Sequence, residues 1–121
     1  MSREIYDEMY IFDFSVRNYE TFEHEVVLED EDGNLIDLSG KTAAGMVRVK
    51  PGASGSPVAV MACAIDRSRG SVTFRLTASQ TAGITPGKYA YDVCLVESVS
   101  GETIRKYIIG GAFVVLPSCT H

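Results

Sequence analysis

The chain has 121 residues, a length typical of one domain, and its composition of 45% hydrophobic and 22% charged residues excludes the disordered and fibrous classes. Sixteen acidic residues stand against eleven basic ones, and the basic ones are scattered, which argues against a nucleic-acid partner. No apolar run approaches the roughly 20 residues that span a bilayer, and no apolar signal-peptide segment follows Met1, so we expect no membrane partner and synthesis in the cytoplasm.

Apolar and polar residues alternate along most of the chain, and no segment keeps an apolar stripe at helical spacing over three turns. The chain is therefore expected to consist of strands. After an N-terminal arm at 1–8, the first strand covers 10–17 and the second covers 22–29. The first strand points four apolar side chains to one side, namely Tyr10, Phe12, Phe14 and Val16.

A tight turn is expected after the second strand, at Gly33, because turns between twisted strands need a positive φ that glycine adopts at little cost. A short return segment at 35–38 then leads to another turn at Gly40. A strand over 42–50 follows, but its residues 43–46 do not show which face points toward the core. The next stretch, 51–57, is rich in Gly, Ser and Pro, which predicts an exposed loop.

Further strands are expected over 58–65 and 72–76. Thr77 and Gln80 then fit a capping box, in which each side chain bonds a free amide at the start of a helix. The helix is expected to stop after about one turn, and the chain reaches Gly87 before the next strand.

The last hairpin is expected to join strands over 88–97 and 103–116. Gly110 and Gly111 interrupt the second of these strands, which predicts a bulge or a bend. Tyr89 stands near the start of the first strand and is a candidate tyrosine corner, whose hydroxyl bonds back to the backbone a few residues upstream.

Seven or eight short strands, one helical turn and no strand–helix–strand spacing predict an all-β, immunoglobulin-like antiparallel β-sandwich. We expect the sandwich to cover 9–117, with a C-terminal tail at 118–121. The cysteines, Cys63, Cys94 and Cys119, are odd in number and lack the close spacing of zinc or redox motifs, so free thiols are expected.

No catalytic site is expected, because a nucleophile needs a base and an orienting group. The only histidines are His24, on the apolar face of its strand, and the terminal His121. The acidic run at 29–32 lacks the spacing of a calcium loop and is expected to be a solvated turn. We therefore expect a protein that is not an enzyme and holds no metal and no cofactor.

Four stretches together carry a family resemblance: the runs 27–40, 46–48, 76–82 and 87–93. They resemble the immunoglobulin-like modules of tailed-bacteriophage virion proteins, including the N-terminal domain type of upper baseplate proteins. The resemblance covers roughly residues 9 to 116.

The resemblance implies a non-enzymatic structural role in a bacteriophage particle, as a tail, baseplate or neck adaptor or as a capsid decoration subunit. It implies location in the virion after synthesis in the host cytoplasm. The implied partners are other virion proteins, such as tail, baseplate, neck or major capsid proteins, with homo-oligomers or many copies on a symmetric particle. It implies no catalytic residues.

The N-terminal arm is the candidate partner-binding segment, with Ile5, Tyr6 and Tyr10 as anchors, because an extended segment can add to a sheet edge of a neighbouring chain. Deletion of 1–8 is expected to leave the fold intact and to abolish incorporation into particles. The alternative function is a carbohydrate-binding or adhesin-type module for attachment to a host surface, which would use exposed tyrosines.

Overall fold

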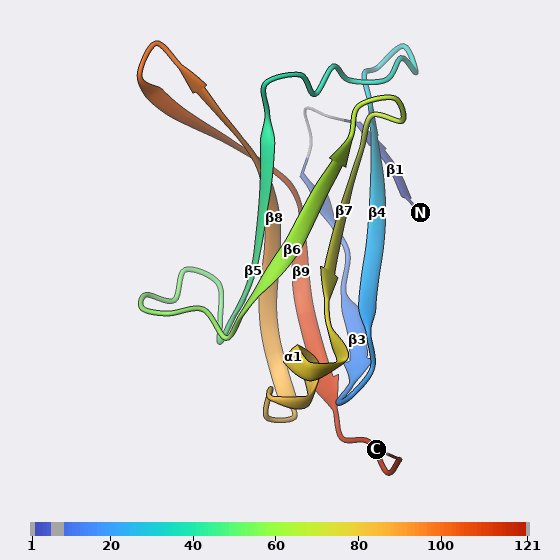
Figure 1. Ribbon diagram of the computed structural model, residues 1–121, viewed down its shortest axis with the longest axis vertical. Coiled ribbons are helices and arrows are strands. Elements are labelled where there is room, and N and C mark those ends of the chain that lie inside the picture. Colours follow the sequence, from blue (N-terminus) through green and yellow to red (C-terminus); the bar gives the residue numbers. More distant parts are fainter. Residues whose placement is uncertain (1, 6–8, 121) are drawn as a thin grey trace.

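The computed structural model describes residues 2–5 and 9–120, and these form an all-β, sandwich-like fold with one short helix (Figure 1). In chain order the strands and helix are β1 Ser2–Ile5, β2 Tyr10–Ile11, β3 Phe14–Arg17, β4 Phe22–Glu29, β5 Thr42–Arg48, β6 Ala59–Asp66, β7 Ser71–Leu76, α1 Ala78–Ala82, β8 Gly87–Val99 and β9 Glu102–Leu116. The predicted fold class is thereby confirmed. Within the described residues, no helix is long and apolar enough to cross a membrane.

The strands form one continuous sheet that folds into two layers, in the order β1-β4-β7-β6-β5-β8-β9-β2, with β3 also paired to β9. The layers join at β6, because Ala59–Met61 pairs with β5 whereas Ala62–Asp66 pairs with β7. One layer thus holds β1, β4, β7 and most of β6, and the other holds β5, β8 and β9. This partition gives the two layers of a sandwich-like fold.

The N-terminal strands depart from the antiparallel pairing expected for the sandwich. β1 runs parallel to β4, and both β2 and β3 run parallel to β9. Alternation of apolar residues shows which face of a strand is buried and carries no information about the direction of its neighbour. The interior pairs from β4 to β9 are antiparallel.

The expected first strand is two strands, because the chain leaves the sheet at Phe12 and Asp13. The N–H of Phe12 still donates to the carbonyl of Gly110 at 3.0 Å. The Asp13 carboxylate then accepts the N–H of Ala112 at 2.8 Å, where a strand would have offered a backbone carbonyl. The expected return segment at 35–38 is likewise reduced to one bridge between Glu29 and Leu35.

The bulge in β9 lies at Ile108, two residues before the predicted glycine pair. Val93 pairs with Ile109 and Cys94 pairs with Tyr107, so Ile108 is the extra residue. The glycines keep regular pairing with β8. Gly111 serves a different purpose, because a Cβ built there would lie 2.6 Å from the carbonyl oxygen of Phe12. The prediction of an irregular final strand is right, and its assigned position is wrong.

The core lies between the two layers and is dominated by aliphatic and aromatic side chains. Phe74 of β7 and Phe113 of β9 are fully buried, and Phe22 packs edge-on against Phe113 with ring centroids 5.1 Å apart. Burial of each such side chain contributes about 1.5–3 kcal/mol. The other fully buried large side chains are Leu28, Leu38, Leu76, Leu95, Ile108, Ile109, Val26, Val47, Val72 and Val93.

The helix α1 closes one end of the sandwich. The predicted capping box is present: the Gln80 N–H donates to Oγ1 of Thr77 at 3.1 Å, and the Thr77 N–H donates to Oε1 of Gln80 at 2.9 Å. The buried Thr81 hydroxyl donates to the carbonyl of Glu20 at 2.8 Å. This last bond attaches the helix to the turn between β3 and β4.

Candidate interaction surface

A groove of about 660 Å³ crosses the outer face of β5, β8 and β9. We call it the outer groove. Its lining residues are Met9, Ile11, Ala44, Gly45, Met46, Arg48, Lys50, Pro51, Gly52, Ala53, Ala90, Tyr91, Asp92, Cys94, Val96, Arg105, Tyr107 and Gly111. The inward residues of β8, such as Val93 and Leu95, build the core, so the alternate residues Ala90 and Cys94 face the groove.

The walls of the outer groove are apolar and accessible. On one side stand Met9, Ile11 and Tyr107, with exposed fractions of 41%, 65% and 43%. On the other side stands the loop that follows β5. Nη1 of Arg48 donates to the carbonyl of Gly55 at 2.8 Å and so holds this loop beside the sheet. Exposed apolar side chains gathered in one hollow are typical of an interaction site.

One carboxylate lies in the floor of the outer groove. Asp92 keeps contact with solvent, but neighbouring protein atoms displace part of the water around its carboxyl. This partial desolvation raises the pKa of the carboxyl, and the charge of Arg48 acts in the opposite direction. The carboxylate of Asp92 makes no hydrogen bond or ion pair with any of the described residues. A ligand in the groove could therefore donate to it.

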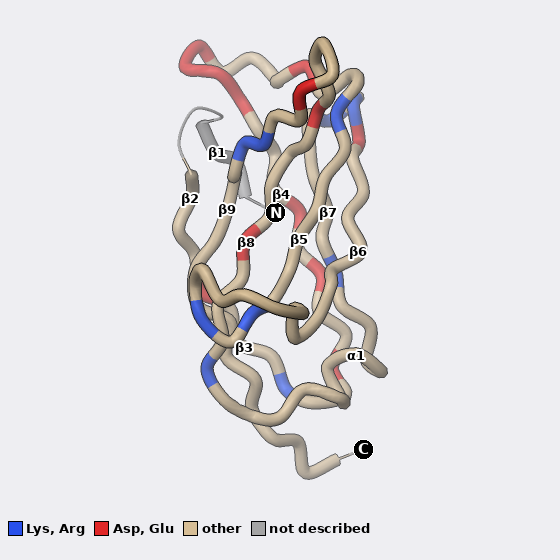
Figure 2. Tube along the Cα trace, turned by 90° about the vertical axis from the view of Figure 1, so that its left-hand side faces the viewer, with Lys and Arg blue, Asp and Glu red and all other residues tan. Residues whose placement is uncertain are grey.

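The charge around the outer groove is positive, although the chain carries a net charge of −5. Arg48, Lys50 and Arg105 line it, against the single acid Asp92. In Figure 2, Lys and Arg segments are spread over the face toward the viewer, and Asp and Glu segments lie at the upper end and also midway along the sheet. An occupant that is apolar and acidic would match this surface.

The predicted arm does not stand away from the sheet where it is described. Ser2–Ile5 forms β1, with Ile5 in register with Glu29 of β4 in the same chain. Tyr6 lies outside the described residues. Tyr10 is half-buried, packs against the core and stacks on Phe12 with ring centroids 5.7 Å apart. Among the residues whose side chains are described, the outer groove presents accessible apolar surface.

The predicted turn residues lie at the ends of elements. Gly33 and Gly40 have φ of 84° and 73°, and the Gly33 N–H donates to the carbonyl of Asp30 at 3.0 Å. Gly87 begins β8. The hydroxyl of Tyr89 donates to the carbonyl of Thr85 at 2.5 Å, a local bond of the kind that a tyrosine corner makes.

The histidine and the acidic residues that could have served a catalytic or metal site are engaged in packing or in turns. His24 lies among the rings of Phe12, Phe14 and Phe74, and burial lowers its pKa. The Asp30 carboxylate accepts the N–H of Asp32. Across residues 9–120, no three His, Cys, Asp or Glu side chains gather as a metal site would require. The cysteines are free, with Cys94 buried and Cys119 exposed.

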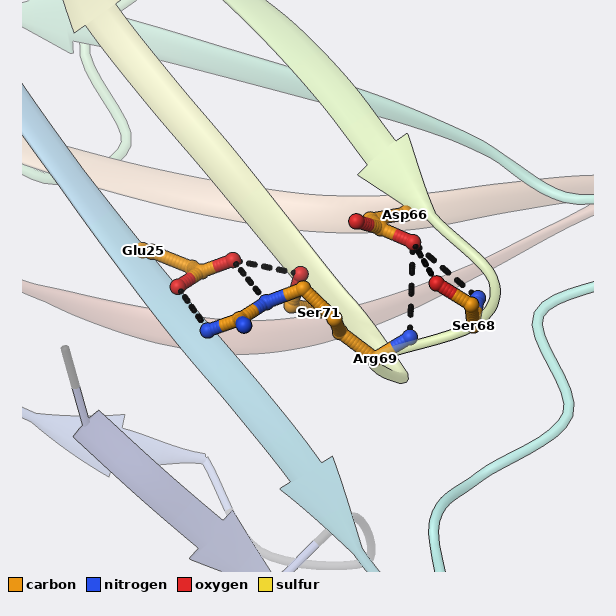
Figure 3. Close-up of polar contacts among 5 residues, drawn as sticks. All are labelled: Glu25, Asp66, Ser68, Arg69 and Ser71. Carbon is orange, nitrogen blue, oxygen red and sulfur yellow. Dashed lines mark hydrogen bonds and ion pairs between the residues drawn. The ribbon is translucent and has the colours of Figure 1, made fainter.

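A polar cluster at the turn between β6 and β7 is structural (Figure 3). Arg69 donates to both carboxylate oxygens of Glu25, from Nε at 3.1 Å and from Nη2 at 2.9 Å. The Ser71 hydroxyl donates to the same carboxylate at 2.8 Å. The hydrogen bonds from Arg69 and then from Ser71 lower the pKa of Glu25. The cluster fastens the turn to β4, and both oxygens of the Glu25 carboxylate accept hydrogen bonds within it.

Among the side chains that the structure describes, the two exposed tyrosines do not form a platform for a sugar ring. Tyr19 lies in the turn between β3 and β4, whereas Tyr107 lies in β9 beside the outer groove. The carbohydrate-binding alternative therefore gains no support from the described geometry.

The sequence did not lead us to predict the outer groove. The available signal was the apolar character of both faces of β5 and β8, since Ala44, Met46, Ala90, Cys94 and Val96 all stand at outward positions. A half-buried strand should carry polar residues there.

Known proteins share the fold of this chain without sharing its sequence. No protein-family model matches it, and no curated protein matches it by sequence. Among solved structures, the N-terminal domain of phage TP901-1 ORF48 is similar, with 11% identity, a TM-score of 0.53, and coverage of 95% of this chain and 98% of that chain. In all, 124 solved chains match, and similarity at this low identity establishes the fold alone.

Proposed function

We propose that the chain is a structural component of a bacteriophage particle and acts through protein–protein contacts, without catalysing a reaction. The observation that carries the proposal is the similarity of fold, end to end, to the N-terminal domain of a phage protein. The sequence resemblance to modules of phage virion proteins points in the same direction. The role is that of a tail, baseplate or neck adaptor or of a capsid decoration subunit.

The outer groove supplies a surface for such contacts. Stable interfaces bury about 800 Å² on each partner, with an apolar centre and a polar rim. The groove combines apolar walls with a rim of Arg48, Lys50 and Arg105. We expect the partners to be other virion proteins, with many copies of the chain on a symmetric particle made in the host cytoplasm. Multiple copies raise the effective concentration, so that individually modest contacts suffice.

The test is the composition of purified particles of the phage that encodes the chain. Quantitative mass spectrometry should find the chain in a fixed copy number per particle, and immunogold labelling should place it at one location. A phage that lacks the gene should assemble defective or undecorated particles, and the wild-type chain supplied in trans should restore them. Complete wild-type particles that contain no copy of the chain would overturn the proposal.

A further inference from the structure

The hairpin between β8 and β9 extends beyond the rest of the sheet. Pairing of β5 with β8 ends at Thr42 and Val96, whereas β8 and β9 continue to pair through Val99 and Glu102. Residues 97–104 therefore have only each other as sheet neighbours, and we call them the β8–β9 ribbon. In Figure 1 the ribbon leans away from the body at the upper left.

One face of the β8–β9 ribbon is apolar and acidic. Val99 pairs directly with Glu102, and Glu97 pairs with Ile104, so these four side chains share a face. Val99 and Ile104 are 46% and 40% exposed. Glu97 forms an ion pair with Lys41 at 2.9 Å, which leaves Glu102 as the acid near the tip. The opposite face carries the hydroxyls of Ser98 and Thr103.

The ribbon and the outer groove complement each other in shape and in charge. The ribbon projects, and the groove is hollow. The ribbon offers Val99, Ile104 and an acid, and the groove offers apolar walls and a cationic rim. The tip can also supply donors to the unpartnered carboxylate of Asp92, from the hydroxyl of Ser100 and from backbone N–H groups.

We propose that a second copy of this chain inserts its β8–β9 ribbon into the outer groove, head to tail. The two surfaces lie on different parts of one molecule, so each copy keeps a free ribbon or groove, and the contact continues to a third copy. A ribbon of this size buries less than about 800 Å², so the contact is weak for the isolated chain. The inference deepens the proposed function by naming how copies meet.

The experiment is sedimentation velocity on the full 121-residue chain at increasing concentration. The wild type should show a weight-average mass that rises beyond that of a dimer as the concentration approaches about 1 mM. Val99→Asp places a charge on the ribbon, and Ala90→Glu fills the groove floor with an acid. Each variant should stay monomeric. Neither site is in the core, so both variants should melt as the wild type does.

A mixture of the two variants is the decisive sample. Val99→Asp keeps an intact groove and Ala90→Glu keeps an intact ribbon, so the mixture should form a one-to-one complex and nothing larger. Tyr19→Asp, an exposed residue in the turn between β3 and β4, is the matched control and should associate like the wild type.

A wild type that is monomeric throughout would overturn the inference, as would a mixture that stays monomeric. Loss of association in Ala90→Glu alone would also overturn it, because the groove would then bind something other than the ribbon. These outcomes are separate from the particle test. A monomeric chain can still be found in particles, and an associating chain can be absent from them.

Discussion

Gly111 is the residue at which β9 lies against the segment between β2 and β3. A Cβ there would lie 2.6 Å from the carbonyl oxygen of Phe12 and 2.8 Å from Oδ1 of Asp13. Both atoms are fixed by hydrogen bonds, so Gly111→Ala should lower the free energy of unfolding by about 2–4 kcal/mol in denaturant titrations. Gly83→Ala, whose Cβ would lie 3.6 Å from the Gln80 carbonyl, is the control and should change stability by less than about 0.5 kcal/mol. Equal effects would contradict the close approach.

The thiols should differ sharply in reactivity. Burial raises the pKa of Cys63 to about 11 and also raises that of Cys94, whereas Cys119 is exposed. At about pH 8 roughly a thousandth of Cys63 is thiolate, so alkylation of the folded chain should label one cysteine quickly. Cys119→Ser should remove the fast phase, as followed by mass spectrometry. Rapid labelling of Cys94 in the folded variant would contradict its burial.

At the scale of elements, Asp13 joins β2 and β3 to β9 across the break between them. Its carboxylate accepts the N–H of Ala112 at 2.8 Å. Asp13→Ala should leave this N–H without a protein acceptor and cost about 1 kcal/mol. Hydrogen exchange should then be faster at Ala112. Asp32→Ala, in the exposed turn after β4, is the control. Unchanged exchange at Ala112 would show that the carboxylate does not fasten these strands.

The contact of β4 with the β6–β7 turn should weaken in acid. The pKa of Glu25 is lowered in the folded chain by Arg69 and Ser71, so its contribution is complete above the unfolded pKa of about 4.3 and is lost as the pH falls through the lower folded pKa. The melting temperature of Glu25→Gln should lie below that of the wild type at about pH 7, and the difference should shrink below about pH 4. A difference that stays constant in acid would contradict this assignment.

Alternation and turn chemistry predicted most elements because both act locally. The capping box at Thr77 and the strands from β4 to β9 follow from side chains close in sequence. The break at Asp13 and the parallel pairing of β2 and β3 with β9 depend on contacts between residues about a hundred positions apart, such as Asp13 with Ala112. The bulge at Ile108 depends on how β8 and β9 pair across their hairpin, and the parallel direction of β1 depends on its contact with β4. No local pattern records such contacts.

At the scale of the whole molecule, the same distinction explains why the outer groove was not foreseen. The sequence shows that β5 and β8 are apolar on both faces, but the hollow needs three strands and a loop placed together. The guanidinium of Arg48 ties the loop to the sheet through the carbonyl of Gly55. The proposed function therefore uses an outer face, while the interior serves packing.

We propose that this outer face is a contact surface in an assembled phage particle. The measurement that tests it most directly is a cryo-electron microscopy reconstruction of the intact particle. The account predicts density for repeated copies of the chain in which a neighbouring polypeptide covers the outer groove of each interior copy. A reconstruction in which the groove of every copy is open to solvent would contradict the account.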